Sequence, residues 1–167
     1  MIFVTVGTTP KPFDRLVRAM DEIAGQLKEE VVIQKGPSKY RVVNARERDF
    51  LTIEELDSLI DESTVVVSHA GVGTIMDAKR HRKPVVVLPR RKELGEMWDN
   101  HQLDTALALR KMQGIFVAEN ESQLIELITT ARESGPSNEV HSKEREALIN
   151  FIKSIIEEDE RQTHDQS

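Results

Sequence analysis

The chain has 167 residues, a net charge of −6 and no cysteine. This length suits one domain with a core of its own, and the absence of cysteine excludes disulfides and thiolate metal sites. Residues 133–167 contain nine Asp or Glu and four Lys or Arg, so most of the negative net charge belongs to the C-terminal segment. With one Trp, one Tyr and no basic stripe, the chain offers little to a nucleic acid, and we expect no such partner.

The N-terminal sequence MIFVTVGTTP lacks a basic n-region, so it predicts a first strand and not a signal peptide. No apolar run approaches the roughly 20 residues that are needed to span a bilayer. We therefore expect a soluble protein, for which a reducing compartment is suitable.

Short apolar runs rich in β-branched residues alternate with segments of helical period. Strands are predicted at residues 2–6, 31–34, 41–43, 65–68, 84–88 and 115–117. Helices are predicted at 13–28, 53–62, 74–81, 100–111 and 121–132, and Thr52 with Glu55 forms a capping box for the second of them. Continuous apolar strands between helices predict a parallel sheet covered on both faces. The expected fold is a Rossmann-like, three-layer α/β sandwich.

The sequence SGPSN at residues 134–138 interrupts this alternation. Beyond it, apolar residues recur at helical spacing and predict a final amphipathic helix; they are Leu148, Phe151, Ile152, Ile155 and Ile156. This helix either packs on its own domain or crosses to a partner surface. We expect a domain over residues 1–132, a linker with this helix over 133–160, and a disordered tail over 161–167.

Ligands of an open parallel sheet bind at the carboxyl ends of its strands. That edge should collect four groups, namely residues 7–9, 34–36, 69–74, and 89–91 with 99–102. The basic run at residues 79–83 ends a helix and enters a strand, so it belongs to the opposite edge. We interpret it as favourable charge at a helix C-terminus.

The segment SHAGVGT at residues 68–74 is the strongest signal at that edge. A buried strand that turns through two glycines into a helix builds a backbone-lined anion pocket, because free N–H groups and the helix dipole favour negative charge. Phosphate or diphosphate is therefore the first ligand to consider. The alternative is that glycine serves only to turn the chain.

Three side chains of this segment carry both a binding and a structural interpretation. His69 would donate to a phosphate or sugar oxygen, or would stabilise its own loop. Thr74 would cap the helix, bind phosphate, or do both. Asp77 would accept from two ribose hydroxyls, or would be an acid stabilised by the helix dipole.

Asn100, His101 and Gln102 suit the hydroxyls of a sugar, or form a capped polar loop. The other site classes fail on spacing. A metal site from His69, His101 and Asp99 has no helix or hairpin spacing to fix its geometry. Ser68 lacks a nucleophile elbow, and the turn at Gly7 lacks the further glycines of a dinucleotide fingerprint.

Four segments together resemble one family: FVTVGTT with FDRL (residues 3–16), SHAGVGTI (68–75), KPVVVLPRRKELGE (83–96) and DNHQ (99–102). Their order and spacing are similar to those of glycosyltransferase family 28 C-terminal-domain proteins, which correspond to the C-terminal half of a GT-B enzyme. The likeness is to the Alg13 type and to its bacterial exopolysaccharide counterparts of the PssE or EpsF type. It covers roughly residues 2–130.

The resemblance implies a UDP-sugar donor site on this chain, with the diphosphate facing the loop from His69 to Thr74. The ribose would be bound by Asp77, the donor sugar by His101 and Gln102, and the uracil by a wall at Phe50 or Leu51. The implied substrate-binding residues are Gly7, Thr8, His69, Ala70, Gly71, Gly73, Thr74, Asp77, Arg90, Asn100, His101 and Gln102.

The resemblance also implies that this chain is half of an enzyme. A membrane-anchored Alg14-like subunit, of the PssD or EpsE type in bacteria, would supply the acceptor half and a lipid-linked saccharide, and would recruit the chain to the cytoplasmic face of the membrane. The general base would lie on that partner, with His69 as the candidate on this chain. Transfer would need no metal or cofactor, with Arg90 stabilising the leaving UDP. The alternative is a non-catalytic accessory subunit that binds a nucleotide sugar or stabilises its partner.

Two positions depart from the family pattern. Arg82 stands where a glycine usually provides a helix C-cap, which we expect to affect local stability only. Trp98 precedes the DNHQ segment, where it would line the donor-sugar pocket or meet a partner.

Overall fold

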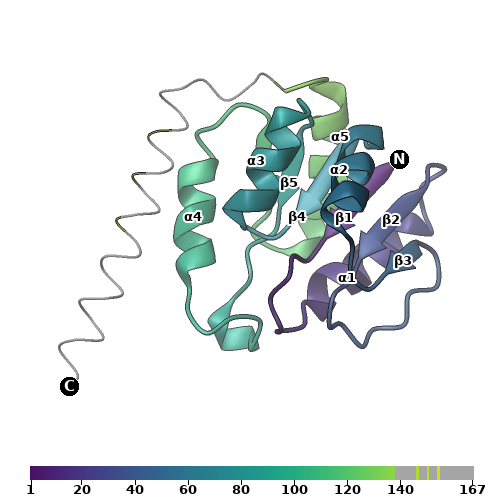
Figure 1. Ribbon diagram of the computed structural model, residues 1–167, viewed down its shortest axis with the longest axis horizontal. Coiled ribbons are helices and arrows are strands. Elements are labelled where there is room, and N and C mark those ends of the chain that lie inside the picture. The colour runs from purple at the N-terminus through teal and green to yellow at the C-terminus, as the bar shows by residue number, and fades with distance from the viewer. Residues whose placement is uncertain (138–145, 147–149, 151–153, 155–167) are drawn as a thin grey trace.

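The computed structural model describes residues 1–137 together with Glu146, Asn150 and Ser154 (Figure 1). The C-terminal helix and tail expected from the sequence lie outside the described residues.

One parallel sheet forms the middle of the described domain. Its strands lie in the order β3-β2-β1-β4-β5-β6. Their bounds are β1 Ile2–Thr5, β2 Val31–Gln34, β3 Arg46–Arg48, β4 Val65–Ser68, β5 Val85–Val87 and β6 Ile115–Val117. The order reverses between β1 and β4, and such a switch point opens a crevice at the carboxyl ends of the two strands.

Helices cover both faces of the sheet (Figure 1). Helices α1 (Asp14–Ala24) and α5 (Leu124–Glu133) pack on one face with Ile2 and Val4 of β1, while Phe3 points into the opposite layer. That layer contains α2 (Ile53–Glu62), α3 (Val72–Arg80) and α4 (His101–Leu109). The predicted three-layer sandwich is thereby confirmed.

The third strand was predicted at the wrong residues. It was expected at 41–43, but β3 is Arg46–Arg48, which pairs with β2 in the register Val32↔Arg46. The apolar residues at 42–43 belong instead to a loop that is tied to α1. There the carboxylate of Asp21, only 1% exposed, accepts from the backbone N–H groups of Val43, Asn44 and Ala45.

Several ends of elements also differ from the prediction. The first helix ends at Ala24, four residues early, and α3 begins at Val72, so that Gly73 lies inside its first turn. Short 3-10 turns occupy Lys92–Leu94 (η1) and Glu121–Gln123 (η2), the second of which was predicted as part of α5. The capping box of Thr52 and Glu55 is present as predicted.

The basic run at residues 79–83 makes local contacts at the amino edge of the sheet. His81 lies between Asp57 at 2.8 Å and Asp61 at 3.1 Å, and so joins α3 to α2. Lys79 donates to the carbonyl of Gln113. Arg82 has a φ of 55°, the left-handed conformation that favours glycine, which explains why the family pattern has glycine there.

Candidate functional site

A cavity of about 280 Å³ opens at the carboxyl ends of β1, β2 and β4. The sequence expectations meet here: Gly7 and Thr8 come from the first strand end, and His69, Gly71, Gly73 and Thr74 from the turn into α3. Phe50 and Leu51, the expected uracil wall, line the same cavity. Its remaining walls are Thr5, Gln34 and Leu56.

The imidazole of His69 is held between two glycine main chains. A Cβ at Gly7 would lie 2.6 Å from its Cε1 atom, and a Cβ at Gly71 would lie 2.2 Å from its Nε2 atom. Real Cβ contacts do not fall below 3.0 Å, so both positions must be glycine for the ring to fit. Gly7 also has a φ of 76°, which itself favours glycine. These two glycines therefore place a histidine as well as turning the chain.

Gly73 has a different surrounding. Apart from its chain neighbours and the backbone of its own helix, a Cβ there would meet no atom of the described residues within 4 Å, and Gly73 lines the cavity. Gly73 lies in the first turn of α3, whose N-cap residue is Gly71 and whose early N–H groups lack intrahelical acceptors. The positive end of the helix dipole therefore faces open space that suits an anion.

His69 is uncharged at neutral pH. Burial and then the nearby charge of Arg90 lower its pKa to about 4, against a smaller opposing effect of its hydrogen bond with the backbone of Thr5. A neutral imidazole of this kind acts as a hydrogen-bonding group in the cavity. It is a weak proton acceptor for catalysis at neutral pH, because the best general base has a pKa near the working pH.

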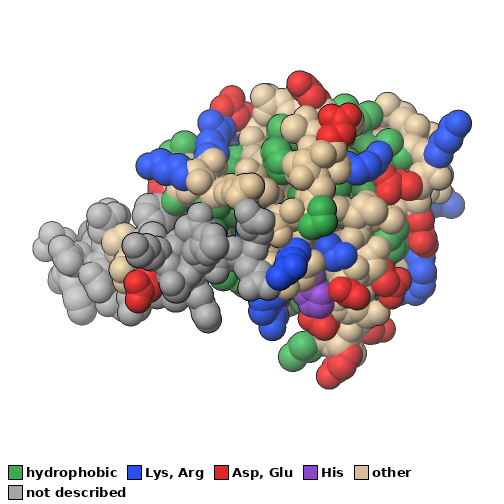
Figure 2. Space-filling view, turned by 90° about the horizontal axis from the view of Figure 1, so that it is seen from above, with side chains coloured by type: hydrophobic (Ala, Val, Ile, Leu, Met, Phe, Trp, Pro, Cys, Tyr) green, Lys and Arg blue, Asp and Glu red, His purple; other side chains and the backbone are tan. Residues whose placement is uncertain are grey.

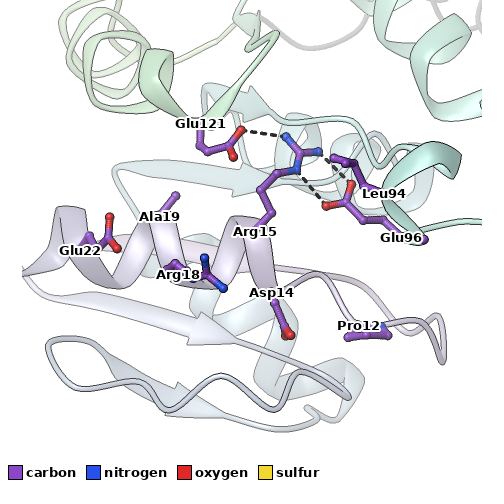
Figure 3. Close-up of a pocket in the computed structure, with 10 residues that line it drawn as sticks. Pro12, Asp14, Arg15, Arg18, Ala19, Glu22, Leu94, Glu96 and Glu121 are labelled. Carbon is purple, nitrogen blue, oxygen red and sulfur yellow. Dashed lines mark hydrogen bonds and ion pairs between the residues drawn. The ribbon is translucent and has the colours of Figure 1, made fainter.

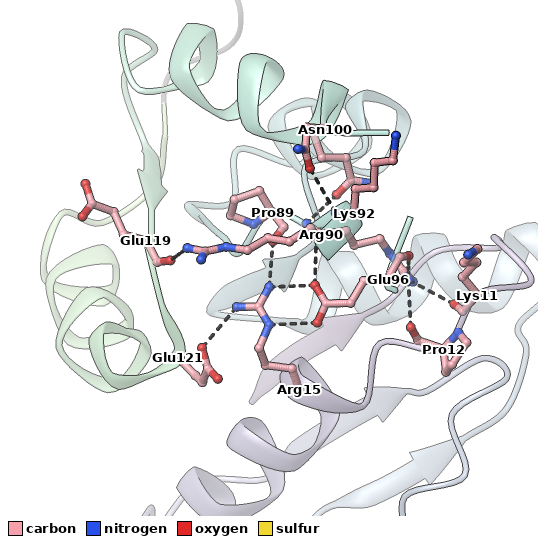
Figure 4. Close-up of polar contacts among 12 residues, drawn as sticks. Lys11, Pro12, Arg15, Pro89, Arg90, Lys92, Glu96, Asn100, Glu119 and Glu121 are labelled. Carbon is pink, nitrogen blue, oxygen red and sulfur yellow. Dashed lines mark hydrogen bonds and ion pairs between the residues drawn. The ribbon is translucent and has the colours of Figure 1, made fainter. Parts of the chain in front are cut away.

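Arg90 lies beneath the site and not in it, which corrects the expectation that its side chain contacts the leaving UDP. It is 0% exposed, and its guanidinium donates to the carbonyls of Lys11, Pro12 and Glu96 at 3.0–3.2 Å (Figure 4). It also donates to the carbonyl of Val6 at 2.8 Å. Burial lowers its pKa to about 10, which leaves it charged at neutral pH. Arg90 thus fixes the loop between β1 and α1 from below.

The side chains of residues 99–102 organise the loop before α4. Gln102 is buried, and its Oε1 atom accepts from the backbone N–H groups of Ala70 at 3.2 Å and Arg90 at 3.0 Å. Asn100 accepts from the N–H of Lys92 (Figure 4), and Asp99 from the N–H of His101. Gln102 therefore joins two loops of the carboxyl edge, and the sugar-binding role of this segment stays a prediction.

Three further expected residues lie outside the cavity lining. Asp77 forms an ion pair with Arg80 one turn along α3. Ala70 is 3% exposed and belongs to the core. Trp98 is exposed, with the ammonium of Lys11 at 5.2 Å from its ring centroid.

A second cavity of about 530 Å³ lies between α1 and the η1 and η2 turns (Figure 3). Its polar centre is Arg15, which binds Glu96 through two bonds of 2.8 and 2.9 Å and Glu121 at 3.1 Å. Neither the cavity nor this network was predicted from the sequence. The network pairs one guanidinium with two carboxylates, and Arg15 also donates to the carbonyl of Pro89, so the network holds the loop after β5 in place.

Basic and acidic side chains are interspersed over the face displayed in Figure 2. Within the described part of the chain, no helix is long and apolar enough to cross a membrane. The described residues also contain no cluster of three or more His, Asp or Glu with metal-binding geometry.

Comparison with known proteins identifies related chains. Among curated proteins, the "UDP-N-acetylglucosamine transferase subunit ALG13" of Mus musculus is 30% identical over 125 residues, which cover 68% of this chain and 10% of that protein. The subunit of the same name from Debaryomyces hansenii is 31% identical over 93 residues, which cover 56% of this chain and 41% of that protein. The similarity thus extends over less than half the length of either relative.

Solved structures share the fold. The NMR solution structure of ALG13 superposes with a TM-score of 0.56 at 22% identity and covers 84% of this chain and 89% of that chain. MurG of Acinetobacter baumannii gives a TM-score of 0.52 at 15% identity and covers 90% of this chain and 49% of that chain. Residues 1–158 match the model of the glycosyltransferase family 28 C-terminal domain. The chain therefore belongs to this glycosyltransferase family and has the Rossmann-like fold of a GT-B half.

Proposed function

We propose that the chain is the donor-binding subunit of a two-component glycosyltransferase that uses a UDP-sugar. One observation carries this proposal: the cavity at the switch point is lined both by the N-terminal turn of α3 and by Phe50 with Leu51. A polar end for a diphosphate and an apolar wall for a base are what a nucleoside diphosphate requires.

UDP-N-acetylglucosamine is the first donor to test, because the curated relatives carry that substrate in their names. In the proposed complex the diphosphate lies against Gly73 and Thr74, and the uracil lies against Phe50 and Leu51. His101 lies nearest the donor sugar. Asp77 binds the ribose if it exchanges its ion pair with Arg80 for the sugar hydroxyls.

The proposed reaction is transfer of the sugar to a hydroxyl of the acceptor. The hydroxyl oxygen bonds to the anomeric carbon while the bond from that carbon to the β-phosphate oxygen breaks, and UDP leaves with the bonding electron pair. The backbone N–H groups and dipole of α3 stabilise the charge that develops on UDP, so that we propose transfer without a metal or cofactor. The proton of the hydroxyl passes to a general base on the partner, since His69 with a pKa of about 4 is poorly matched to that task.

The acceptor half is proposed to come from a separate, membrane-anchored subunit of the Alg14-like type. In support, the chain covers 49% of the MurG chain, which is one half of a GT-B architecture. The partner would present a lipid-linked saccharide and recruit this chain to the cytoplasmic face of the membrane. An exopolysaccharide pathway of the PssE or EpsF type belongs to the same proposal.

A non-catalytic accessory subunit is the alternative. It predicts UDP-sugar binding without turnover, or no binding, when the chain is combined with its partner. If the reconstituted pair transfers sugar and Gly73→Trp abolishes this transfer, the chain has the catalytic role, because a stabilising subunit does not need an open donor cavity.

Calorimetry with UDP and UDP-N-acetylglucosamine tests the donor site on the isolated chain and on the complex. Gly73→Trp should abolish binding, because the indole fills the cavity in front of α3. Leu107→Trp is the matched control, since Leu107 is a 60% exposed residue of α4. Absence of binding by the wild-type chain, alone and with its partner, would overturn the proposed function.

A further inference from the structure

Two buried polar side chains lie opposite each other at the ends of β1 and β2, in the wall of the cavity. Thr5 is 2% exposed and Gln34 is 4% exposed, and they are partners in the strand register. The hydroxyl of Thr5 donates to Oε1 of Gln34 at 2.6 Å. The same hydroxyl accepts from the N–H of Gly7 at 3.1 Å. The sequence offered no signal for this pair, because each residue alone is an ordinary polar end to a strand.

The amide of Gln34 has only one chemically acceptable orientation. Its Nε2 atom donates to the carbonyl of Gly7 at 3.2 Å and to the carbonyl of Asp49 at 3.0 Å. Two carbonyl groups require the nitrogen, and the hydroxyl proton of Thr5 requires the oxygen. Both N–H groups of the amide are thus occupied. Gln34 therefore has no N–H left to donate to a ligand, and its two donors hold the backbone around the cavity.

That backbone belongs to both ends of the cavity. Gly7 has a φ of 76°, and both its N–H and its carbonyl are bound by the pair. Asp49 directly precedes the apolar wall of Phe50 and Leu51. Gln34 therefore connects the turn at Gly7, 27 residues before it, to Asp49, 15 residues after it, at the start of the segment that forms the wall.

We propose, on the basis of the proposed function, that Thr5 and Gln34 are positioning residues for the nucleotide. They set the distance between the turn at Gly7, which lies against His69 of the loop that faces the diphosphate, and the wall that faces the base. They contact no part of the nucleotide through a free donor. A preformed cavity of fixed spacing binds without a cost of ordering its loops.

Thr5→Val tests the pair, because valine keeps the branched shape and removes the hydroxyl. We expect the affinity of the full chain for UDP to fall on the order of tenfold, which corresponds to about 1.4 kcal/mol. Thr5→Ser restores the hydroxyl and should bind UDP within about threefold of the wild type. The loss of affinity should be smaller for uridine, which has no diphosphate, than for UDP. Thr5→Val removes the bond that holds Gly7, next to His69 of the diphosphate-facing loop, and leaves the bond from Gln34 to Asp49 beside the apolar wall.

Ser63→Ala provides the control for a loss of stability alone. Ser63 is 3% exposed, and its hydroxyl donates to the carbonyl of Ile60 at 2.8 Å at the end of α2, before β4 begins. This variant should lower the melting temperature and leave UDP affinity unchanged. Hydrogen exchange of the Gly7 amide adds a second measurement, which should accelerate in Thr5→Val and not in Ser63→Ala.

Wild-type affinity for UDP in Thr5→Val, or unchanged exchange of the Gly7 amide, would overturn the inference while the proposed function stands. Failure of the wild-type chain and its complex to bind UDP would instead overturn the proposed function, and this inference with it. If Thr5→Val does not fold, Thr5→Cys takes its place, because a thiol keeps the shape of serine but bonds weakly. It should lose affinity that Thr5→Ser retains.

Discussion

The two glycines at the start of α3 should respond in opposite ways to a single methyl group. At Gly71 a Cβ atom would lie 2.2 Å from Nε2 and 2.6 Å from Cε1 of His69. At Gly73 it would have no atom of the described chain within 4 Å beyond its chain neighbours and the backbone of its own helix. Gly71→Ala and Gly73→Ala are therefore a matched pair, two residues apart in one turn.

The expected magnitudes follow from these contacts. Gly71→Ala forces the imidazole from its place between two main chains, and overpacking of this kind costs about 1–3 kcal/mol. For a chain of this size each kcal/mol lowers Tm by about 2–4 °C. Gly73→Ala exchanges glycine for a better helix former, which stabilises by up to about 1 kcal/mol, so its Tm should stay equal or rise.

Thermal melting and UDP calorimetry on the two variants separate folding from binding. Gly73→Ala should melt like the wild type and yet bind UDP on the order of tenfold more weakly, because its methyl group occupies the approach of the diphosphate to the backbone. In a His69→Ala background the added methyl at Gly71 meets no ring. There Gly71→Ala should cost little, and the non-additivity measures the contact.

Equal changes of Tm in the two alanine variants would refute the steric account of His69. The steric account would also be refuted if Gly71→Ala lowered Tm as much in the His69→Ala background as it does in the wild type. Wild-type UDP affinity in Gly73→Ala would show that the diphosphate does not lie against that residue.

Three further changes test contacts outside the cavity. Arg82→Gly should raise the free energy of unfolding, measured in urea, by about 0.5–1 kcal/mol. Glycine removes the strain of a φ of 55°, but part of this gain is offset because glycine gives the unfolded chain more conformational entropy. Hydrogen bonds to Asp57 and Asp61 raise the pKa of His81 above 6.5, so its contribution is fully present below pH 6.5 and is lost as the pH rises through the raised pKa. His81→Gln should abolish that decline of the free energy of unfolding, and an unchanged pH profile would contradict the assignment. Arg90→Met leaves four carbonyls without their donor and should cost about 3 kcal/mol or more in the same assay, whereas a cost under about 1 kcal/mol would speak against its structural role.

The alternation of strands and helices could be predicted because its signals are local. Apolar β-branched runs such as Val65 to Val67 mark strands wherever they occur, and a 3.6-residue period marks helices. Strand β3 has no such signal, since Arg46, Glu47 and Arg48 are all exposed. It is a strand because its backbone pairs with β2, and that pairing depends on a distant segment.

The candidate site likewise has features that the sequence predicted and features that it did not. The rule that ligands bind at the carboxyl ends of strands correctly brought Gly7, His69 and Gly73 to one cavity. It did not reveal that Arg90 is buried, since its carbonyl partner Val6 lies 84 residues away in the sequence. Nor did it reveal that Gln102 joins two loops through its amide oxygen.

By itself the sequence determined the order of the elements, the parallel sheet and the edge at which the candidate cavity lies, because periodicity, turn residues and strand polarity are properties of short segments. Only the tertiary structure decided which polar side chains at that edge face the cavity and which are buried there in hydrogen bonds to other parts of the chain. The physical reason is that a buried donor or acceptor must find a partner, and the partners of Arg90, Gln102 and Gln34 come from other strands and loops.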